Sequence, residues 1–279
     1  MWKSYRPKKS VDLECFFTLF ETTYDSDYFF TGETHDFWEL VYVREGDVCV
    51  SADERIFHLS KGEIIFHKPM ELHKFHIENG KPATLFIMSF SATGSLMKKF
   101  ENCVLRLSPE QRRDFSNMLF FLHNECALSD QCDLACLEEM EKHSSKFQVF
   151  ICMAELLLLS LSSEGVSISA AEDTPETIVY RKAVQTMEKR IGEWISVPEI
   201  AENCNVSVSY LKKLFAKYAG LGIHQYFLKI KIIYASRMLK AGKSVAETAA
   251  ELSFSSPNYF STVYKRETGI TPRVYKNGC

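Results

Sequence analysis

The chain has 279 residues, of which 46% are hydrophobic and 25% charged, and its net charge is −3. These values are typical of a globular protein with two cores and exclude a disordered or fibrous chain. Nine scattered cysteines form no disulfide framework, no secretory cleavage site follows the basic N-terminus, and the most apolar stretch, residues 147–162, is too short for a membrane span. We therefore expect a cytoplasmic protein with no membrane partner.

Residues 37–90 contain six short runs rich in β-branched and aromatic residues, each bounded by turn signals such as Lys68-Pro69 and Asn79-Gly80. The runs are FWELVYV, DVCVS, RIFHL, EIIFH, HKFHI and ATLFIMSF. Such regular punctuation is typical of an antiparallel sandwich or barrel. We therefore predict an all-β barrel within residues 1–107.

The next segment, residues 108–163, has a helical pattern. Ser108 and Pro109 are typical of a helix start, with the serine as N-cap and the proline at the first position. Residues 147–161 are apolar on more than one helical face. One face must pack on the same domain, and the other is buried either on a second subunit or within the same chain. We interpret this segment as a dimerisation element and expect a homodimer.

A group of metal-ligand residue types lies in the same segment: His123, Cys126, Cys132, Cys136 and His143. No CxxC pair is present, and the spacing matches no zinc module. We interpret the cysteines as buried and reduced, with a metal site or thiol switch as the alternative.

The charge is divided unequally between the two ends of the chain. Residues 1–177 hold 17 Lys and Arg against 29 Asp and Glu, a net of −12, whereas residues 178–279 hold 16 against 7, a net of +9. The intervening residues 164–177 are small, polar and aperiodic, and they are predicted to form a linker. A separate basic domain suggests a polyanionic partner, although a charged surface often serves only solvation.

The basic domain contains two copies of one unit. Ser196-x-x-Glu199 and Ser244-x-x-Glu247 are capping boxes that each start a short helix. Ser207 and Ser256 are the next N-caps, each followed by a second helix with apolar residues on one face. The pattern predicts helix-turn-helix units at about 196–218 and 244–267, joined by one helix over residues 224–243.

The second helix of each unit presents a polar outward face that can enter a major groove of DNA. An ordinary helical bundle whose polar faces meet only water is the alternative. Because one helix joins the units, the two recognition helices can enter successive grooves about 34 Å apart. The predicted DNA-binding residues are Ser207, Ser209, Tyr210, Lys212, Lys213, Ser256, Asn258, Ser261, Thr262 and Lys265.

This C-terminal domain resembles the DNA-binding domain of AraC/XylS-type bacterial transcription regulators. The resemblance rests on IAENCNVSVSYLKKLF, YFSTVYKRETGITP and the joining helix, in the family's order and spacing. Ser253 departs from a usual glycine and Lys231 from a usual arginine. A serine held at positive φ costs on the order of 1 kcal/mol relative to glycine, whereas Asn205, at the matching position of the first copy, tolerates that conformation better.

The predicted barrel is similar to a cupin, which regulators of this family use as a sensing domain. The similarity rests on His35, three residues, Glu39, six residues and Gly46, and more loosely on GEIIFHKPMELH. Metal-binding cupins use two histidines and a glutamate from the first motif and a histidine from the second. His35, Glu39 and His73 match three of these ligands, and Glu33 stands where the remaining histidine would be.

Three interpretations of these residues stay open: an effector pocket, ordinary structural residues, or a metal site. We favour a pocket for a small-molecule effector, with no metal and no other cofactor, because Glu33 departs from the metal-binding pattern. The predicted effector-binding residues are His35, Trp38, Glu39, Tyr42, Phe66 and His73.

The predicted fold is two-domain and mixed: an all-β cupin-like barrel with appended helices, then an all-α tandem helix-turn-helix domain at 178–279. The predicted function is a DNA-binding transcription regulator controlled by a small molecule, with no enzymatic activity. The alternative is a metal-dependent cupin enzyme fused to a DNA-binding domain. Expected partners are double-stranded DNA, the effector and a second copy of the chain, and RNA polymerase is a candidate. The sequence names neither effector nor operator, and it does not separate activation from repression.

Overall fold

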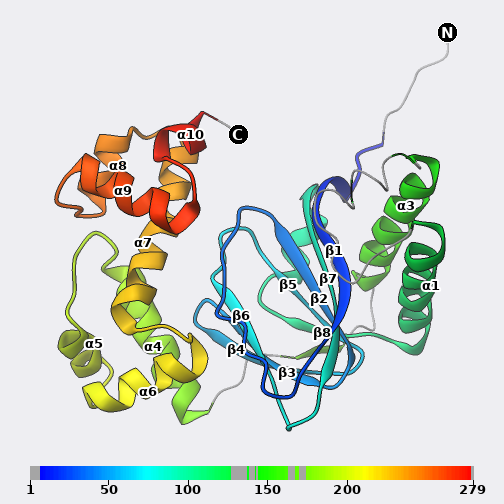
Figure 1. The fold of residues 1–279 in the computed structure, drawn as a ribbon, viewed down its shortest axis with the longest axis horizontal. Helices are drawn as coiled ribbons and strands as arrows, with labels where there is room; N and C mark the ends of the chain where they lie inside the picture. The colour runs from blue at the N-terminus through cyan, green and yellow to red at the C-terminus, as the bar shows by residue number, and fades with distance from the viewer. Residues whose placement is uncertain are drawn as a thin grey trace.

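The chain folds into an N-terminal β domain and a C-terminal helical domain that lie side by side in the computed structural model (Figure 1). The structure describes residues 7–126, 144–162, 167–169 and 174–277, together with positions 137 and 142. The predicted order of a β-rich domain followed by a helical domain is confirmed. Among the described helices, none is both long and apolar enough to cross a membrane.

Two antiparallel sheets form the β domain. One sheet has six strands in the order β1-β7-β2-β5-β8-β9, and the other has three in the order β4-β3-β6. The strands are β1 (Asp12–Tyr24), β2 (Trp38–Glu45), β3 (Asp47–Ala52), β4 (Arg55–Ser60), β5 (Glu63–His67), β6 (His73–Ile77), β7 (Ala83–Thr93), β8 (Val104–Arg106) and β9 (Ser167–Ser169). The six predicted runs correspond to β2 through β7. Strands β1, β8 and β9 were not predicted, and the last two are too short to show any periodicity.

The β domain has two apolar layers because its strand residues alternate in direction. Residues facing the space between the sheets, such as Val41, Val50 and Phe75, form one core. The opposite face of the six-stranded sheet forms a second core with helices α1 (Pro109–Glu125) and α3 (Ser144–Leu161), and the short helix η1 (Leu96–Phe100) also joins it. Figure 1 shows α1 and α3 on the outer side of this sheet, away from the helical domain.

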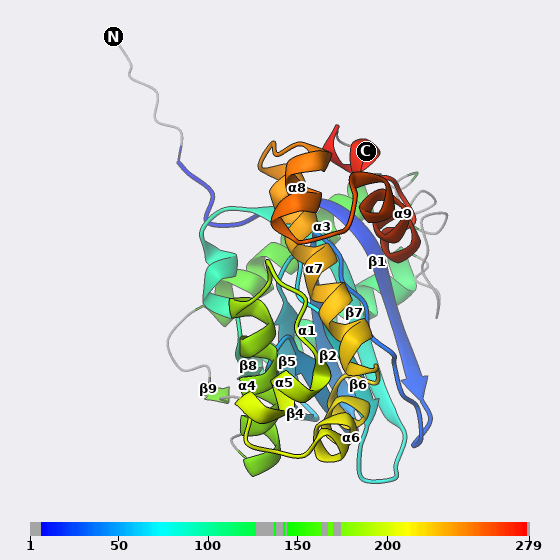
Figure 2. The same ribbon diagram turned by 90° about the vertical axis from the view of Figure 1, so that its left-hand side faces the viewer.

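The helical domain places one helix-turn-helix unit at each end of a long helix, α7 (Figure 2). Its helices are α4 (Pro175–Lys189), α5 (Val197–Asn203), α6 (Val208–Tyr218), α7 (Ile223–Lys240), α8 (Val245–Glu251), α9 (Pro257–Thr268) and α10 (Pro272–Lys276). Both predicted capping boxes are present, at the starts of α5 and α8. Ser207 and Ser256 cap α6 and α9 as predicted, and Pro257 occupies the first turn of α9.

The predicted linker at 164–177 is wrong at two places. Residues 167–169 form β9, which pairs with β8 at the edge of the six-stranded sheet. Thr174 caps α4, so the first turn of that helix also falls within the predicted linker. Small polar residues misled the prediction because they suit both a short edge strand and a helix N-cap.

The three-stranded sheet docks directly on the helical domain. Cys49, Ile56 and Leu72 from the β domain share one apolar core with Tyr180 and Tyr226 of the helical domain. Polar contacts reinforce the docking: Ser51 Oγ donates to the carbonyl oxygen of Tyr218 at 2.8 Å, and Lys74 Nζ donates to that of Lys217 at 2.9 Å. Because both carbonyls lie at the C-terminal end of α6, the β domain satisfies acceptors that the helix itself leaves open.

Candidate DNA interface and effector site

The first helix-turn-helix unit is built as the sequence predicts. Leu211, Leu214 and Phe215 of α6 are fully buried in the core that holds Ile200 of α5. The turn between the helices requires a left-handed residue, and Asn205 supplies it with φ of 58°. Asparagine tolerates this conformation better than most residues, so the turn directs α6 at little cost.

The second unit repeats this arrangement. Phe260, Val263 and Tyr264 of α9 are at most 1% exposed and pack in one core with residues of α8. Gly269 ends α9 in the left-handed conformation, with φ of 82°. Each unit therefore buries one side of its second helix and leaves the other side toward solvent.

Ser253 occupies the left-handed turn position of the second unit, with φ of 55°. Its hydroxyl donates to the carbonyl oxygen of Gly192, and its own carbonyl accepts from Trp194 Nε1 at 2.8 Å. Glycine could not form the first of these bonds. The serine thus offsets part of its backbone strain by tying the α8–α9 turn to the segment between α4 and α5.

Lys231 connects the two units from within. The residue is fully buried on α7, and its ammonium group donates to the carbonyl oxygens of Ile191 at 2.5 Å and Leu252 at 3.0 Å. It also lies 4.7 Å from the ring centroid of Trp194, which is a cation–π contact. Burial lowers the pKa of Lys231 to about 8. One side chain therefore holds the segment between α4 and α5 and the end of α8 against α7.

The predicted DNA-binding residues divide into three groups by what their side chains do. The hydroxyls of Ser207 and Ser256 accept the capping N–H groups of their own helices. The hydroxyls of Ser261 and Thr262 donate to carbonyls one turn earlier in α9, and Tyr210 is half-buried against the domain core. The remaining residues are exposed: Ser209, Lys212, Lys213, Asn258 and Lys265.

Asn258 and the two lysines are the strongest candidates for contacts outside the protein. Among the described residues, the side chains of Asn258, Lys212 and Lys213 form no hydrogen bond or ion pair. Tyr259, which was not among the predicted residues, is 52% exposed beside Asn258. An exposed aromatic residue in the first turn of a capped helix was the signal that could have found it.

A cluster of polar side chains lies at one end of the space between the sheets. Glu39 on β2 is 7% exposed; its Oε1 atom lies 3.3 Å from His73 Nε2 and its Oε2 atom lies 3.7 Å from His35 Nε2. Ser89 Oγ donates to the same carboxylate at 3.0 Å. Glu33 completes the group, and one ligand atom from each of the four acidic and histidine residues lies within 4.8 Å of the others.

The charges of this cluster stabilise one another. Burial disfavours the Glu39 carboxylate, but His35 and His73 outweigh that cost and hold the pKa of Glu39 well below its usual range. Burial also opposes protonation of His73, but the hydrogen bonding and charge of Glu39 outweigh it and raise the pKa of His73 to about 9. The cluster therefore holds a carboxylate and a positive charge at neutral pH.

The structure corrects the predicted effector pocket. His35, Glu39 and His73 lie together, but Trp38, Tyr42 and Phe66 belong to the core beneath α1 and α3, on the opposite face of the six-stranded sheet. Trp38 and Tyr42 lie an odd number of residues from Glu39 on the same strand, so alternation directs them away from it. The space between the sheets is filled by apolar side chains such as Phe57, which leaves the polar group at its end.

Two residues of this region were missed. His67 pairs with Glu39 in the register of β2 and β5, and its ring stacks on His73 with centroids 4.1 Å apart. Its Nδ1 atom lies 2.7 Å from Glu71 Oε2, and both residues are 2% exposed. GEIIFHKPMELH contains both, with His67 at the end of β5 and Glu71 in the loop before β6, so the spacing of His67 and Glu71 within this motif was the available signal.

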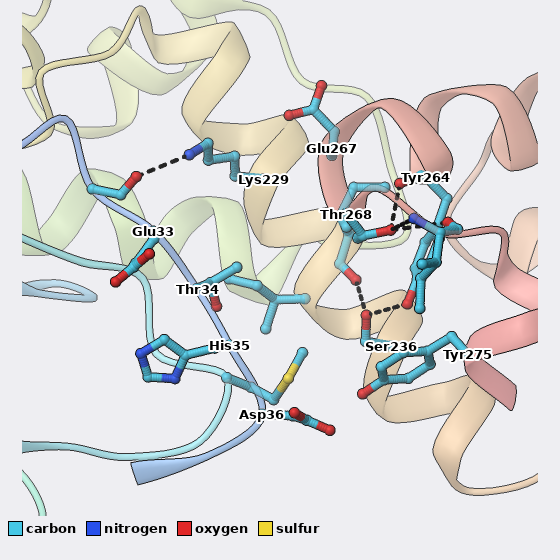
Figure 3. A pocket seen from close by; sticks show the side chains of 15 residues that line it. Glu33, Thr34, His35, Asp36, Lys229, Ser236, Tyr264, Glu267, Thr268 and Tyr275 are labelled. Carbon is cyan, nitrogen blue, oxygen red and sulfur yellow. Dashed lines mark hydrogen bonds between the residues drawn. The ribbon is translucent and has the colours of Figure 1, made fainter. Parts of the chain in front are cut away.

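A pocket of about 300 Å³ lies between the two domains, next to the polar cluster (Figure 3). Figure 3 shows Glu33, Thr34, His35 and Asp36 along one side, with residues of α7, α9 and α10 on the other. The far side includes Ser236, Tyr264, Thr268 and Tyr275, and Ser236 Oγ lies 2.7 Å from the Tyr264 hydroxyl oxygen. We call this the interdomain pocket.

The interdomain pocket is rich in acidic groups. Glu33, Asp36 and Glu267 contribute carboxylates, and Lys229 contributes the only ammonium group among the described lining residues. Lys229 Nζ already donates to the carbonyl oxygen of Gly32 at 3.5 Å. Two of these carboxylates are ion-paired beside the pocket, Asp36 with Lys240 at 3.5 Å and Glu267 with Arg266 at 2.7 Å.

Helix α3 has the two apolar faces that the sequence predicts. Phe150, Ala154, Leu157, Leu158 and Leu161 are at most 4% exposed and pack in the β domain. Three residues of the other face remain exposed, at 46% for Val149, 67% for Leu156 and 43% for Leu159. In the predicted cysteine group, Cys126 is buried and His123 bonds to its own helix, whereas Cys132, Cys136 and His143 lie outside the described residues.

Comparison with known proteins identifies the family. A helix-turn-helix domain model matches residues 200–278, and a model of the AraC-like ligand binding domain matches residues 16–114. Over 115 residues the chain is 33% identical to an uncharacterized HTH-type transcriptional regulator of Pseudoalteromonas carrageenovora, which covers 41% of this chain and 69% of that protein. The chain belongs to the AraC-type family of helix-turn-helix transcription regulators.

Other comparisons extend over most of the regulator. It is 24% identical over 267 residues to the HTH-type transcriptional activator RhaR of Cronobacter sakazakii, which covers 88% of this chain and 87% of that protein. Among solved structures, ToxT of Vibrio cholerae O395 matches with a TM-score of 0.40 and 14% identity over 97% of this chain and 98% of that one. The predicted resemblance to AraC-type regulators is confirmed by the two family models.

Proposed function

We propose that this regulator reads DNA with α6 and α9 placed in successive major grooves. The observation that supports this most is that α6 and α9 each bury one face and expose the other on opposite ends of α7. Lys231 of α7 adds rigidity, because it bonds to Ile191 before α5 and to Leu252 after α8. Major grooves on one face of DNA recur about every 34 Å. Two helices held at a fixed separation can therefore bind two neighbouring grooves without a second subunit.

Asn258 is the proposed base reader of α9. It lies in the first turn of a capped helix, where recognition helices reach base edges, and its amide can bond adenine in bidentate fashion. Lys212 and Lys213 of α6 either bond guanine or hold phosphate. The other predicted residues support the two helices or contact the backbone of DNA. They are Ser207, Ser209, Tyr210, Ser256, Ser261, Thr262 and Lys265.

We place the effector in the interdomain pocket rather than in the interior of the β domain. The lining combines several hydroxyls with carboxylates that are already ion-paired, which favours a neutral polyol. Because segments of both domains form the pocket, a ligand there acts on how the domains are held relative to each other. An effector of this kind should raise the melting temperature of the wild type but not that of Glu267→Gln. An equal rise in both proteins would show that the effector binds outside this pocket.

The exposed stripe of α3, Val149, Leu156 and Leu159, is the proposed dimer contact. A homodimer would present four recognition helices to one operator. Relatives that are named transcriptional activators favour activation, with RNA polymerase as the further partner, and a cytoplasmic location follows from that role. The same relatives favour regulation over the enzyme alternative.

Binding-site selection tests DNA recognition. With the full chain, the wild type should select a defined sequence, and Asn258→Ala should relax preference at one position with little change in salt dependence. Lys213→Ala, if it holds phosphate, should weaken all sequences alike and lower the salt slope by about one. Selection of the wild-type sequence at every position by Asn258→Ala would remove Asn258 as a base reader.

A further inference from the structure

The three-stranded sheet brings a thiol, two imidazoles and a carboxylate together on the face that docks on the helical domain. Cys49 of β3 pairs directly with His58 of β4 on one side and with His76 of β6 on the other. Directly opposite residues of antiparallel strands point to the same face of a sheet. Cys49 is 3% exposed and lies in the core shared with the helical domain, which identifies that face.

Glu78, two residues after His76, completes the group. One ligand atom from each of Cys49, His76 and Glu78 lies within 4.8 Å of the other two. Glu78 Oε1 is 3.9 Å from His76 Nε2, and Glu78 Oε2 is 2.6 Å from His58 Nδ1. One histidine therefore holds the carboxylate while its other oxygen faces the second histidine, and such a hydrogen bond is the support that metal-bound carboxylates usually have.

We propose that Cys49, His76 and Glu78 bind one Zn²⁺ ion, with His58 as the positioning residue that orients Glu78. Thiolate, imidazole and carboxylate are all zinc ligands, and the thiolate disfavours harder ions such as Mg²⁺ and Ca²⁺. Metal–ligand distances of about 2.0–2.3 Å place the ligand atoms of a tetrahedral ion roughly 3.3–3.8 Å apart, so movements on the order of 1 Å complete the site. Three protein ligands leave the fourth position to water or another small ligand.

The two lysines nearest this group are held by other acceptors. Lys217 Nζ pairs with Glu176 Oε2 at 2.6 Å. Lys74 Nζ donates to the carbonyl oxygen of Lys217 at 2.9 Å and lies 4.1 Å from the ring centroid of Phe29. The Cys49 thiolate and the Glu78 carboxylate supply two negative charges, which match the charge of a divalent ion.

The proposed zinc site lies between the two domains. A cavity of about 300 Å³ beside the ligands is also lined by Thr174, Glu176, Lys217 and Tyr218 of the helical domain. Lys217 and Tyr218 lie at the C-terminal end of α6. An ion bound here therefore connects the β domain to the end of that helix. The site is separate from the polar cluster around Glu39, because His73 and His76 lie on opposite faces of β6.

Cobalt substitution tests the site on the full chain, purified without a histidine tag, kept reduced and stripped of metal with a chelator. Co²⁺ bound to a thiolate gives a charge-transfer absorption band in the near ultraviolet, which a site without sulfur lacks. We expect the band to saturate at one equivalent of Co²⁺, to disappear when Zn²⁺ displaces the cobalt, and to be absent in Cys49→Ser.

Zinc affinity, measured by competition with the bound cobalt, tests the other residues. His76→Asn and Glu78→Gln remove ligands and should weaken Zn²⁺ binding at least ~10-fold. His58→Asn removes only the support of Glu78, so it should weaken binding roughly 10–100-fold and keep the cobalt band. The side chains of His76 and Glu78 are 25% and 24% exposed, so these variants test the site even where Cys49→Ser fails to fold.

Cys103→Ser is the matched control, because Cys103 is also a buried cysteine of the β domain and its thiol bonds to the carbonyl oxygen of Lys99. His35→Asn is the control for the polar cluster around Glu39. Both controls should keep the band and the zinc affinity of the wild type. No band in the wild type, a band that persists in Cys49→Ser, or unchanged zinc affinity in His76→Asn and Glu78→Gln would overturn the proposal. A band lost only in Cys103→Ser or in His35→Asn would overturn it as well.

Hydrogen exchange tests where the ion acts. Zn²⁺ should slow exchange of the amides of residues 215–219 in the wild type and not in His76→Asn, because the ion holds the sheet against the end of α6. Unchanged exchange in the wild type would overturn the link between the ion and this helix.

Discussion

The left-handed turn at Ser253 gives a quantitative test of how the second helix-turn-helix unit is built. At φ of 55° a serine costs on the order of 1 kcal/mol relative to glycine, and its hydroxyl bond to Gly192 returns about 0.5–1.5 kcal/mol. Ser253→Gly removes the strain and the bond together, so its free energy of unfolding should stay within about 0.5 kcal/mol of the wild type. Ser253→Ala keeps the strain and loses the bond, so it should be about 1 kcal/mol less stable.

Urea unfolding of the full chain, followed by circular dichroism, measures these differences. Ser255→Ala is the control, because Ser255 is exposed two residues further along and substitutions at such surface positions usually change stability by less than about 0.5 kcal/mol. A Ser253→Ala protein as stable as the wild type would show that the hydroxyl bond contributes nothing. A Ser253→Gly protein less stable than Ser253→Ala would refute the assignment of backbone strain to this turn.

Three further predictions concern the core of the helical domain and the surface of α3. Lys231→Met leaves the buried carbonyls of Ile191 and Leu252 without donors. Urea unfolding should show a free energy of unfolding about 1–3 kcal/mol below that of the wild type. Unchanged stability would contradict the role of Lys231 as a connector. The pKa of Lys231 is 10.5 in the unfolded chain and about 8 in the folded protein. Between about pH 8 and 10.5 the unfolded state therefore carries a proton that the folded state has lost, so unfolding takes up a proton. Wild-type stability relative to Lys231→Met should accordingly rise with pH across that window, and a constant difference would contradict the lowered pKa. Leu156→Glu places a charge in the exposed stripe of α3. In sedimentation, the wild type should be a dimer and Leu156→Glu a monomer. A monomeric wild type would contradict the proposed contact.

Local signals account for most of what could be predicted from the sequence. The capping serines, the left-handed turns at Asn205 and Ser253 and the apolar faces of α6 and α9 depend on residues within one or two turns of each other. Such features are written in short stretches of sequence, and the structure reproduces them. The six strands from β2 to β7 were found for the same reason, since turn residues bound each one.

The candidate site was harder to predict because it depends on which way side chains point and how domains dock. Trp38 was grouped with Glu39 because the two are neighbours, although adjacent strand residues face opposite sides of a sheet. The interdomain pocket joins residues near 33, 233 and 268, and no pattern in the sequence indicates that these segments meet. Glu33 was read as a departure from a metal-binding pattern, but only the fold shows that its carboxylate lies beside His73.

Footprinting tests the central account most directly, namely that one chain places two recognition helices on DNA. The full chain is bound to the sequence recovered by selection, and backbone protection is mapped by hydroxyl-radical cleavage. The account predicts, for each bound chain, two protected segments on one face of the duplex, about 34 Å or one helical turn apart. A single protected segment per chain, or protection without a preferred sequence, would contradict it.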